Sequence, residues 1–113
     1  MTNEVNFLAV FKQECEDYLI TNMNRLSQQV EEGTVSNLHL VGSMDFINEV
    51  AIKVSGLASK LNSTETELYI KIDLPLIKNL YAEVKSGTIA PKHIVKRLNE
   101  LITSLEELVS DDK

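Results

Sequence analysis

Residues 40–61, LVGSMDFINEVAIKVSGLASKL, decide the fold of this chain. Their apolar positions recur at alternating intervals of four and three residues, which is the spacing of one buried stripe on an α-helix. The stripe comprises Leu40, Met44, Ile47, Ala51, Val54, Ala58 and Leu61, and it is widened by Phe46, Val50 and Leu57. Ser36 is a suitable N-cap and Asn62-Ser63-Thr64 a suitable end. We therefore expect the central, most buried helix here.

Two further segments have equally regular stripes. The first runs from about Asn3 to Glu32 and stops at Gly33, a residue typical of helix C-caps. Its stripe is Leu8, Phe11, Cys15, Leu19, Met23, Leu26 and Val30. The last segment starts at Pro91, which is favoured in the first turn of a helix. Its stripe is Ile94, Leu98, Leu101, Leu105 and Leu108. Both segments are predicted to be amphipathic helices.

The segment between them is less regular. Thr64 or Thr66 opens a short helix, and Asp73-Leu74-Pro75 then interrupts it, because a proline ring clashes with the preceding helical turn. Asp73 is the predicted N-cap of a helix from Leu74 to Ser86; the interruption either kinks one helix or separates two. Since no segment alternates with period two, we predict one all-α domain, residues 1–113. It is an antiparallel four-helix bundle, with an extra short helix before Pro75 as the open alternative.

Composition narrows the classes of partner. A net charge of −6 argues against unaided binding to nucleic acid or to an anionic membrane, because both need clustered Lys and Arg. The apolar runs are too short to span a bilayer, and no secretory pattern opens the chain. The single cysteine, Cys15, lies on an apolar stripe, where we expect a buried thiol. We expect a cytoplasmic protein that is a monomer or a weak homodimer.

Residues for catalysis are few. The only histidines are His39 and His93, and neither belongs to a zinc-binding spacing. The glycines are scattered and form no phosphate-binding loop, while the acidic pairs fall on predicted solvent faces. No nucleophile can be paired with a base from this inventory. We therefore expect no metal, no cofactor and no enzyme of conventional type.

One face of the central helix contains an unexpected apolar residue. Opposite the core stripe lie Asp45, Asn48, Glu49, Ile52, Ser55, Gly56 and Ser59. Ile52 is the one large apolar member, and Gly56, one turn later, leaves a side-chain gap beside it. Either Ile52 packs under the irregular third segment and Gly56 permits a close helix crossing, or the two residues form an open docking patch for a protein partner.

Residues 51–58, AIKVSGLA, resemble the signature Ala-His-x-Leu-Lys-Gly-x-Ala of histidine phosphotransfer (HPt) domains, in particular those of chemotaxis histidine kinases. Residues 11–19 are similar to the first helix of that family and residues 76–87 to its third. The resemblance covers most of the chain and implies a bacterial two-component signalling protein built as a four-helix bundle. In that family the signature lies on the second helix.

The departures from the signature determine the expected function. Ile52 stands where the family has its phosphoacceptor histidine, and Ser55 stands where it has a lysine. Isoleucine cannot accept a phosphoryl group, and serine cannot supply the ammonium that neutralises one. The resemblance thus implies a degenerate, non-enzymatic HPt-like module that docks a receiver domain or a histidine kinase. Its partner-binding residues would be those of the face around Ile52 and Gly56.

Two alternatives remain open. Residues 38–43, LHLVGS, resemble a family variant, His-x-Leu-x-Ser, in which His39 would be the phosphoacceptor of an active phosphocarrier. In that alignment the glycine and the lysine are out of place. The second alternative is a toxin-neutralising or immunity-type helical bundle, which the acidic charge and small size also fit. His93, in the first turn of the last segment, is expected to be structural.

Overall fold

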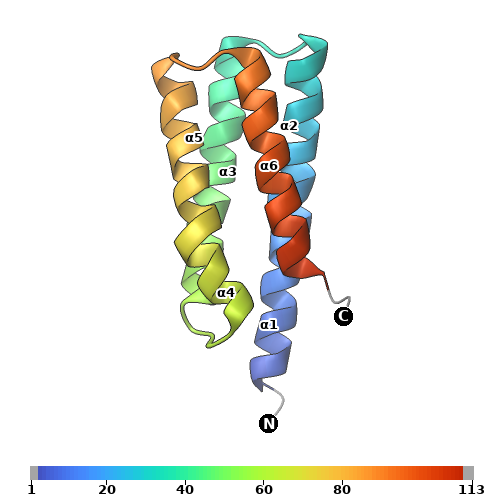
Figure 1. Ribbon diagram of the computed structural model, residues 1–113, viewed down its shortest axis with the longest axis vertical. Coiled ribbons are helices and arrows are strands. Elements are labelled where there is room, and N and C mark those ends of the chain that lie inside the picture. Colours follow the sequence, from blue (N-terminus) through green and yellow to red (C-terminus); the bar gives the residue numbers. More distant parts are fainter. Residues whose placement is uncertain (1–2, 111–113) are drawn as a thin grey trace.

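In the computed structural model, which describes residues 3–110, four helical rods run antiparallel and are joined by short connections (Figure 1). Every secondary-structure element in that range is a helix. The predicted all-α four-helix bundle is therefore confirmed. The molecule measures 48 × 24 × 18 Å along its principal axes, with the rods along the longest axis.

The first rod consists of α1 (Asn3–Glu14), the π-helical stretch η1 (Cys15–Ile20) and α2 (Thr21–Glu32). Within η1 the wider turn is marked by the N–H of Thr21, which donates to the carbonyl of Glu16, five residues back. Gly33 ends the rod with φ 71°, a left-handed conformation that glycine adopts without a steric penalty. The predicted helix from Asn3 to Glu32 and its glycine C-cap are confirmed.

The second rod is α3 (Asn37–Ala58). Ser36 caps it as predicted, since its Oγ accepts the N–H of His39 at 3.1 Å. The predicted stripe is buried from Leu40 to Ala58, whereas Leu61 lies beyond the helix and is half-buried. The expectation that Phe46 widens the core is wrong: its side chain is 46% exposed, because it lines a groove between α2 and α3.

The third rod joins α4 (Thr64–Leu68), the π-helical stretch η2 (Tyr69–Asp73) and α5 (Leu74–Ser86) without interruption. The rod is continuous, so the alternative in which residues 73–75 separate two helices is wrong, and so is the prediction that Asp73 is an N-cap. Asp73 has helical angles (φ −71°, ψ −44°) and makes no cap hydrogen bond. The N–H of Leu74 donates to the carbonyl of Tyr69, five residues back. This wider turn directly precedes Pro75 and accommodates a ring that a regular helix would not.

The fourth rod is α6 (Pro91–Val109), and its whole predicted stripe is buried. It packs on α2, while α3 packs on α5. The buried apolar residues of all four rods form one cluster. Phe11 and Tyr69 are fully buried in it and form an edge-to-face pair, with ring centroids 5.5 Å apart and an interplanar angle of 80°. Packing in this core sets the orientation of α3, so that one face of residues 45–59 points away from the core.

Candidate functional site

The outward face of α3 contains all seven residues that the sequence nominates for partner binding. We call this face the Ile52 surface, and its residues are Asp45, Asn48, Glu49, Ile52, Ser55, Gly56 and Ser59, the last being the C-cap of α3. Asn48 and Ser55 are half-buried and the other five are exposed. The surface is thus a polar helix face that surrounds one apolar side chain.

Ile52 and Gly56 form an apolar side chain beside an open notch. Ile52 is 46% exposed, so about half of a large aliphatic side chain stays in contact with water. A Cβ added at Gly56 would meet no other helix, and no side chain apart from those of its two chain neighbours, within 4 Å. Gly56 therefore does not serve a close helix crossing within this chain, which was one of the two sequence-based interpretations. The space above Gly56 is open to the outside.

Most polar side chains of the Ile52 surface already have a hydrogen-bond partner within the chain, but Asn48 Oδ1 has none. Ser55 Oγ donates to the carbonyl of Ile52 at 2.6 Å, and Ser59 Oγ donates to the carbonyl of Gly56 at 3.0 Å. Asp45 Oδ1 accepts the hydroxyl of Tyr81 on α5 at 2.8 Å, which links α3 to its neighbour. By contrast, Asn48 Oδ1 is buried without a hydrogen-bond partner. The serines need no partner, while Asn48 retains an unused acceptor.

The Ile52 surface rests on a rigid support. Ala51 is buried, and its carbonyl accepts the hydroxyl of Tyr69 at 2.6 Å. Burial raises the pKa of that hydroxyl, and the nearby Cys15 and Asp73 raise it further, so Tyr69 stays a neutral donor. The backbone beneath Ile52 is therefore held by a buried hydrogen bond from another rod.

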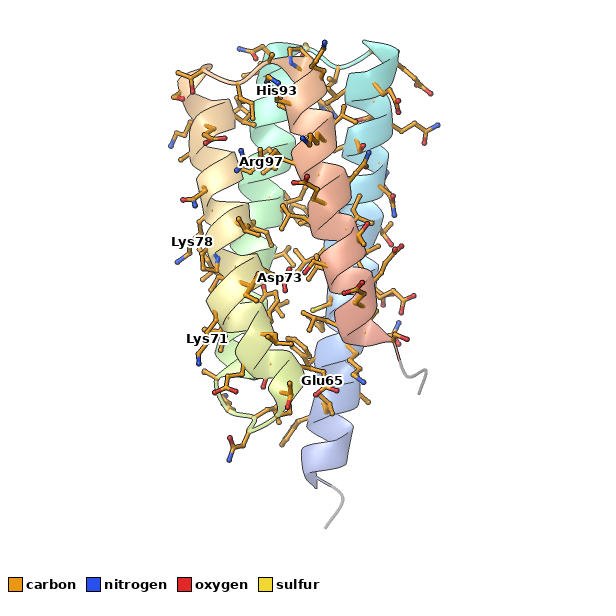
Figure 2. The ribbon with its side chains drawn as sticks, viewed as in Figure 1. Glu65, Lys71, Asp73, Lys78, His93 and Arg97 are labelled. Atoms are coloured by element: carbon orange, nitrogen blue, oxygen red, sulfur yellow. The ribbon has the colours of Figure 1, made fainter. Side chains whose placement is uncertain are left out.

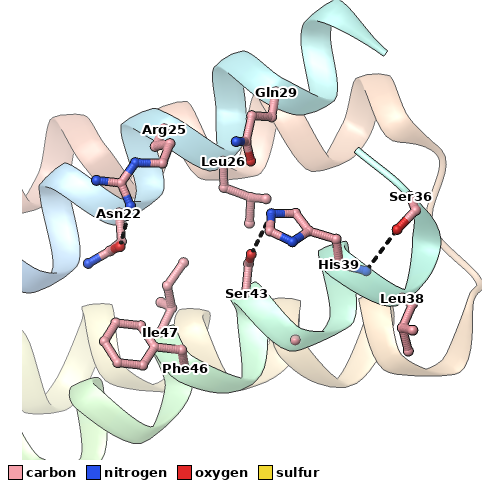
Figure 3. Close-up of a pocket in the computed structure, with 11 residues that line it drawn as sticks. Asn22, Arg25, Leu26, Gln29, Ser36, Leu38, His39, Ser43, Phe46 and Ile47 are labelled. Atoms are coloured by element: carbon pink, nitrogen blue, oxygen red, sulfur yellow. Dashed lines mark hydrogen bonds between the residues drawn. The ribbon is translucent and has the colours of Figure 1, made fainter. Parts of the chain in front are cut away.

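His39 lies elsewhere, in a groove of about 620 Å³ between α2 and α3 (Figure 3). Its Nε2 is 3.4 Å from Ser43 Oγ, and the imidazole is exposed. Arg25 lines the same groove from α2 and donates from Nη1 to Asn22 Oδ1 at 3.2 Å. His93 is also exposed but lies on α6, in a separate hollow shared with Arg97 (Figure 2). The two histidines do not form one site.

A buried polar group around Asp73 is the feature that sequence reasoning missed. Asp73 is 1% exposed, and its Oδ1 accepts Ser104 Oγ of α6 at 2.6 Å (Figure 2). Burial raises the pKa of Asp73, and the Ser104 hydrogen bond partly opposes that shift. Burial also raises the pKa of the Cys15 thiol to about 12, with smaller contributions from the charges of Asp73 and Glu14. The signal was present, since Asp73 falls at helical spacing between Tyr69 and Ile77.

The described residues offer neither a metal site nor a membrane-spanning helix. Within residues 7–110, no group of three or more His, Cys, Asp or Glu side chains is placed to hold a metal ion. None of the helices described is long and apolar enough to cross a bilayer. Comparison of the chain with family models, with curated proteins and with solved structures finds no match. Functional inference therefore depends on the chain's own residues.

Proposed function

We propose that this protein is a non-enzymatic interaction module that docks a protein partner through the Ile52 surface. The observation that carries the proposal is the pairing of a 46% exposed isoleucine with an unfilled space at Gly56. A few anchor residues supply most of the binding energy in protein interfaces, and they occupy pockets from which water is excluded. Ile52 is the apolar anchor, and the notch at Gly56 admits a side chain of the partner.

The surroundings of Ile52 support a docking role. The helix is held from beneath by the Tyr69 hydroxyl, so little conformational entropy is lost when a partner binds. Glu49 and Asp45 place acidic groups at the rim, where they favour a partner with basic residues and accelerate its association.

The resemblance to HPt domains names a class of partner. Residues 51–58 lie on the second rod of a four-helix bundle, as the signature does in that family. With Ile52 in place of the phosphoacceptor, the module would bind a receiver domain or a histidine kinase of a two-component system without accepting a phosphoryl group. This would place it in the cytoplasm of a bacterium.

A matched pair of substitutions tests the proposal. Ile52→Asp introduces a charge at the proposed anchor, and Ile72→Asp makes the same change at an isoleucine of η2 that is 47% exposed. Affinity is measured by calorimetry against receiver domains and histidine kinases encoded in the same genome. We expect Ile52→Asp to weaken binding by about tenfold or more and Ile72→Asp to leave it unchanged.

Thermal melting of the same variants separates docking from folding. Because the two isoleucines are equally exposed, we expect both variants to melt within a few degrees of the parent chain. Equal losses of affinity in the two variants would contradict the proposal. So would a much larger loss of stability in Ile52→Asp, because Ile52 would then be a structural residue.

A second candidate, an active phosphocarrier, is favoured by the surroundings of His39. The imidazole is exposed in the groove that Arg25 also lines, and a guanidinium neutralises phosphoryl oxygens well. The test is incubation with a radiolabelled phospho-receiver or an active kinase, followed by measurement of acid-labile label on the chain. His39→Gln should abolish the label, while the matched His93→Gln should keep it. Absence of label on the parent chain, or its persistence in His39→Gln, excludes this function.

A further inference from the structure

The groove between α2 and α3 has an apolar floor and a mixed rim, in which two exposed apolar residues stand among polar ones (Figure 3). Leu26 and Ile47 are buried at its floor, whereas Phe46 is 46% and Leu38 is 85% exposed. Leu38 is the most exposed large hydrophobic side chain in the part of the chain described. None of these four residues belongs to the Ile52 surface, so the groove is a separate feature of the molecule.

The charge of the groove is opposite to that of the chain as a whole. The chain has 17 acidic against 11 basic residues, yet none of the eleven described residues lining the groove is acidic. Arg25 and His39 line it, together with the amides of Asn22 and Gln29. The hydrogen bond from Arg25 goes to the neutral Asn22, whereas Arg97 is paired with Glu83 at 2.8 Å. The guanidinium of Arg25 thus retains its capacity to pair with a carboxylate.

The dimensions of the groove fit a helix. Its walls are two helices, α2 and α3, and Leu38 and Phe46 are separated by about two helical turns, or about 12 Å. A third helix packs into such a groove through apolar side chains spaced by three and four residues. The floor, Phe46 and Leu38 provide contacts for those side chains, and Arg25 provides a contact for an acidic residue next to them.

We propose that this groove docks an acidic amphipathic helix of a partner protein. The apolar side chains of that helix cover Phe46 and Leu38, and its carboxylates pair with the Arg25 guanidinium. This interaction is additional to docking at the Ile52 surface, since the two sites share no residue. Each can therefore be lost while the other is kept.

The probe is a synthetic peptide of about four helical turns, with leucines spaced by three and four residues and glutamates beside them. A second peptide has lysine in place of each glutamate. Titration into the ¹⁵N-labelled chain should shift the amide resonances of residues 25–29 and 36–47. We expect the glutamate peptide to bind more tightly than the lysine peptide by about tenfold or more, and this preference should decrease with added salt.

Matched variants locate the interaction. Arg25→Glu should weaken the glutamate peptide by about fivefold or more, while Lys60→Glu, which changes the net charge equally beyond the far end of α3, should change it less than twofold. Phe46→Ser should weaken both peptides by about fivefold or more, and the matched Leu76→Ser, at an exposed leucine of α5, should weaken neither.

Several results would overturn the proposal. These are equal affinity for the two peptides, equal effects of Arg25→Glu and Lys60→Glu, or shifts confined to other residues. Resonances of residues 36–47 that move with protein concentration before peptide is added would assign the groove to a second copy of this chain, and would also overturn it. Variants that fail to bind must keep the amide spectrum of the parent chain outside the groove. If both Arg25→Glu and Phe46→Ser lose the dispersed spectrum of a folded chain, these residues are structural and the proposal is refuted.

Discussion

Replacement of Asp73 by asparagine should stabilise this protein at neutral pH. Asp73 is 1% exposed, and no ion pair among the described residues reaches it; its one hydrogen bond comes from the neutral Ser104. A buried carboxylate without a counter-charge opposes folding, because its charge loses hydration that a single hydrogen bond does not replace. Asparagine has the same shape and keeps an oxygen for the Ser104 hydroxyl.

The size of the effect depends on the surroundings of Asp73. Leaving a buried polar group unsatisfied costs about 1–3 kcal/mol, and Asp73→Asn removes the charge but keeps a polar side chain. Asp73 lines a hollow of about 370 Å³ together with Ser104 and Glu107, but it is only 1% exposed, so the new amide brings N–H groups that lose hydration in their turn. We therefore expect a gain near the lower end, about 1 kcal/mol, and a rise in melting temperature of about 4 °C.

The pH dependence has a definite sign. Burial raises the pKa of Asp73 above its ordinary 3.8, so the folded chain holds this proton more tightly than the unfolded chain does. The protonated carboxyl favours folding fully below about pH 3.8, and this contribution is lost as the pH rises through the folded-state pKa. The advantage of Asp73→Asn should therefore be small near pH 3.8 and should grow toward neutral pH.

Melting curves measured by circular dichroism across this pH range test the prediction. Asp17→Asn is the control, because Asp17 is exposed and its carboxylate accepts the Gln13 amide at 3.0 Å. The control should melt within about 2 °C of the parent chain at every pH. An Asp73→Asn variant that is less stable than the parent at neutral pH, or an advantage that grows as the pH falls, would refute the reasoning.

Three further predictions concern the interior and the glycine notch. Tyr69→Phe should lower the free energy of unfolding by about 1–2 kcal/mol in urea titrations, because the Ala51 carbonyl loses its buried donor; an unchanged midpoint would show that this bond adds no stability. Cys15, buried and with a pKa of about 12, should react with a thiol reagent only in the unfolded chain, and fast labelling of the native protein would contradict its burial. Gly56→Ala should raise stability by about 1 kcal/mol, since its Cβ meets open space; destabilisation would reveal a hidden contact.

The fold could be predicted from the sequence because the apolar periodicity is regular over most of the chain. The stripes of the first, second and fourth rods are buried nearly throughout, and the capping residues Ser36 and Gly33 lie where their chemistry predicts. Local chemistry dictates both features. A helix in a bundle must bury its apolar stripe, and glycine is the residue that most easily takes a left-handed cap.

The third rod could not be predicted in the same way, because local rules alone do not determine whether a helix continues through a proline. Pro75 predicts a break, and Asp73 is a good N-cap by type. In the folded chain, the buried ring of Tyr69 and the Ser104 hydroxyl hold residues 69–73 in a wider turn, so the rod continues and Asp73 points inward. Phe46 illustrates the same limit, since its helical position suits the core but the space between α2 and α3 leaves it at the surface.

The most direct test of the proposed docking function is a map of where a bound partner contacts the chain. Cross-saturation from an unlabelled receiver domain or kinase to the ²H,¹⁵N-labelled chain reports amides at the interface. We predict that the affected amides centre on residues 45–59 of α3, with Ile52 and Gly56 among the most strongly affected. An interface confined to η2 and α6, or to the groove that contains His39, would contradict the proposal that the Ile52 surface is the docking site.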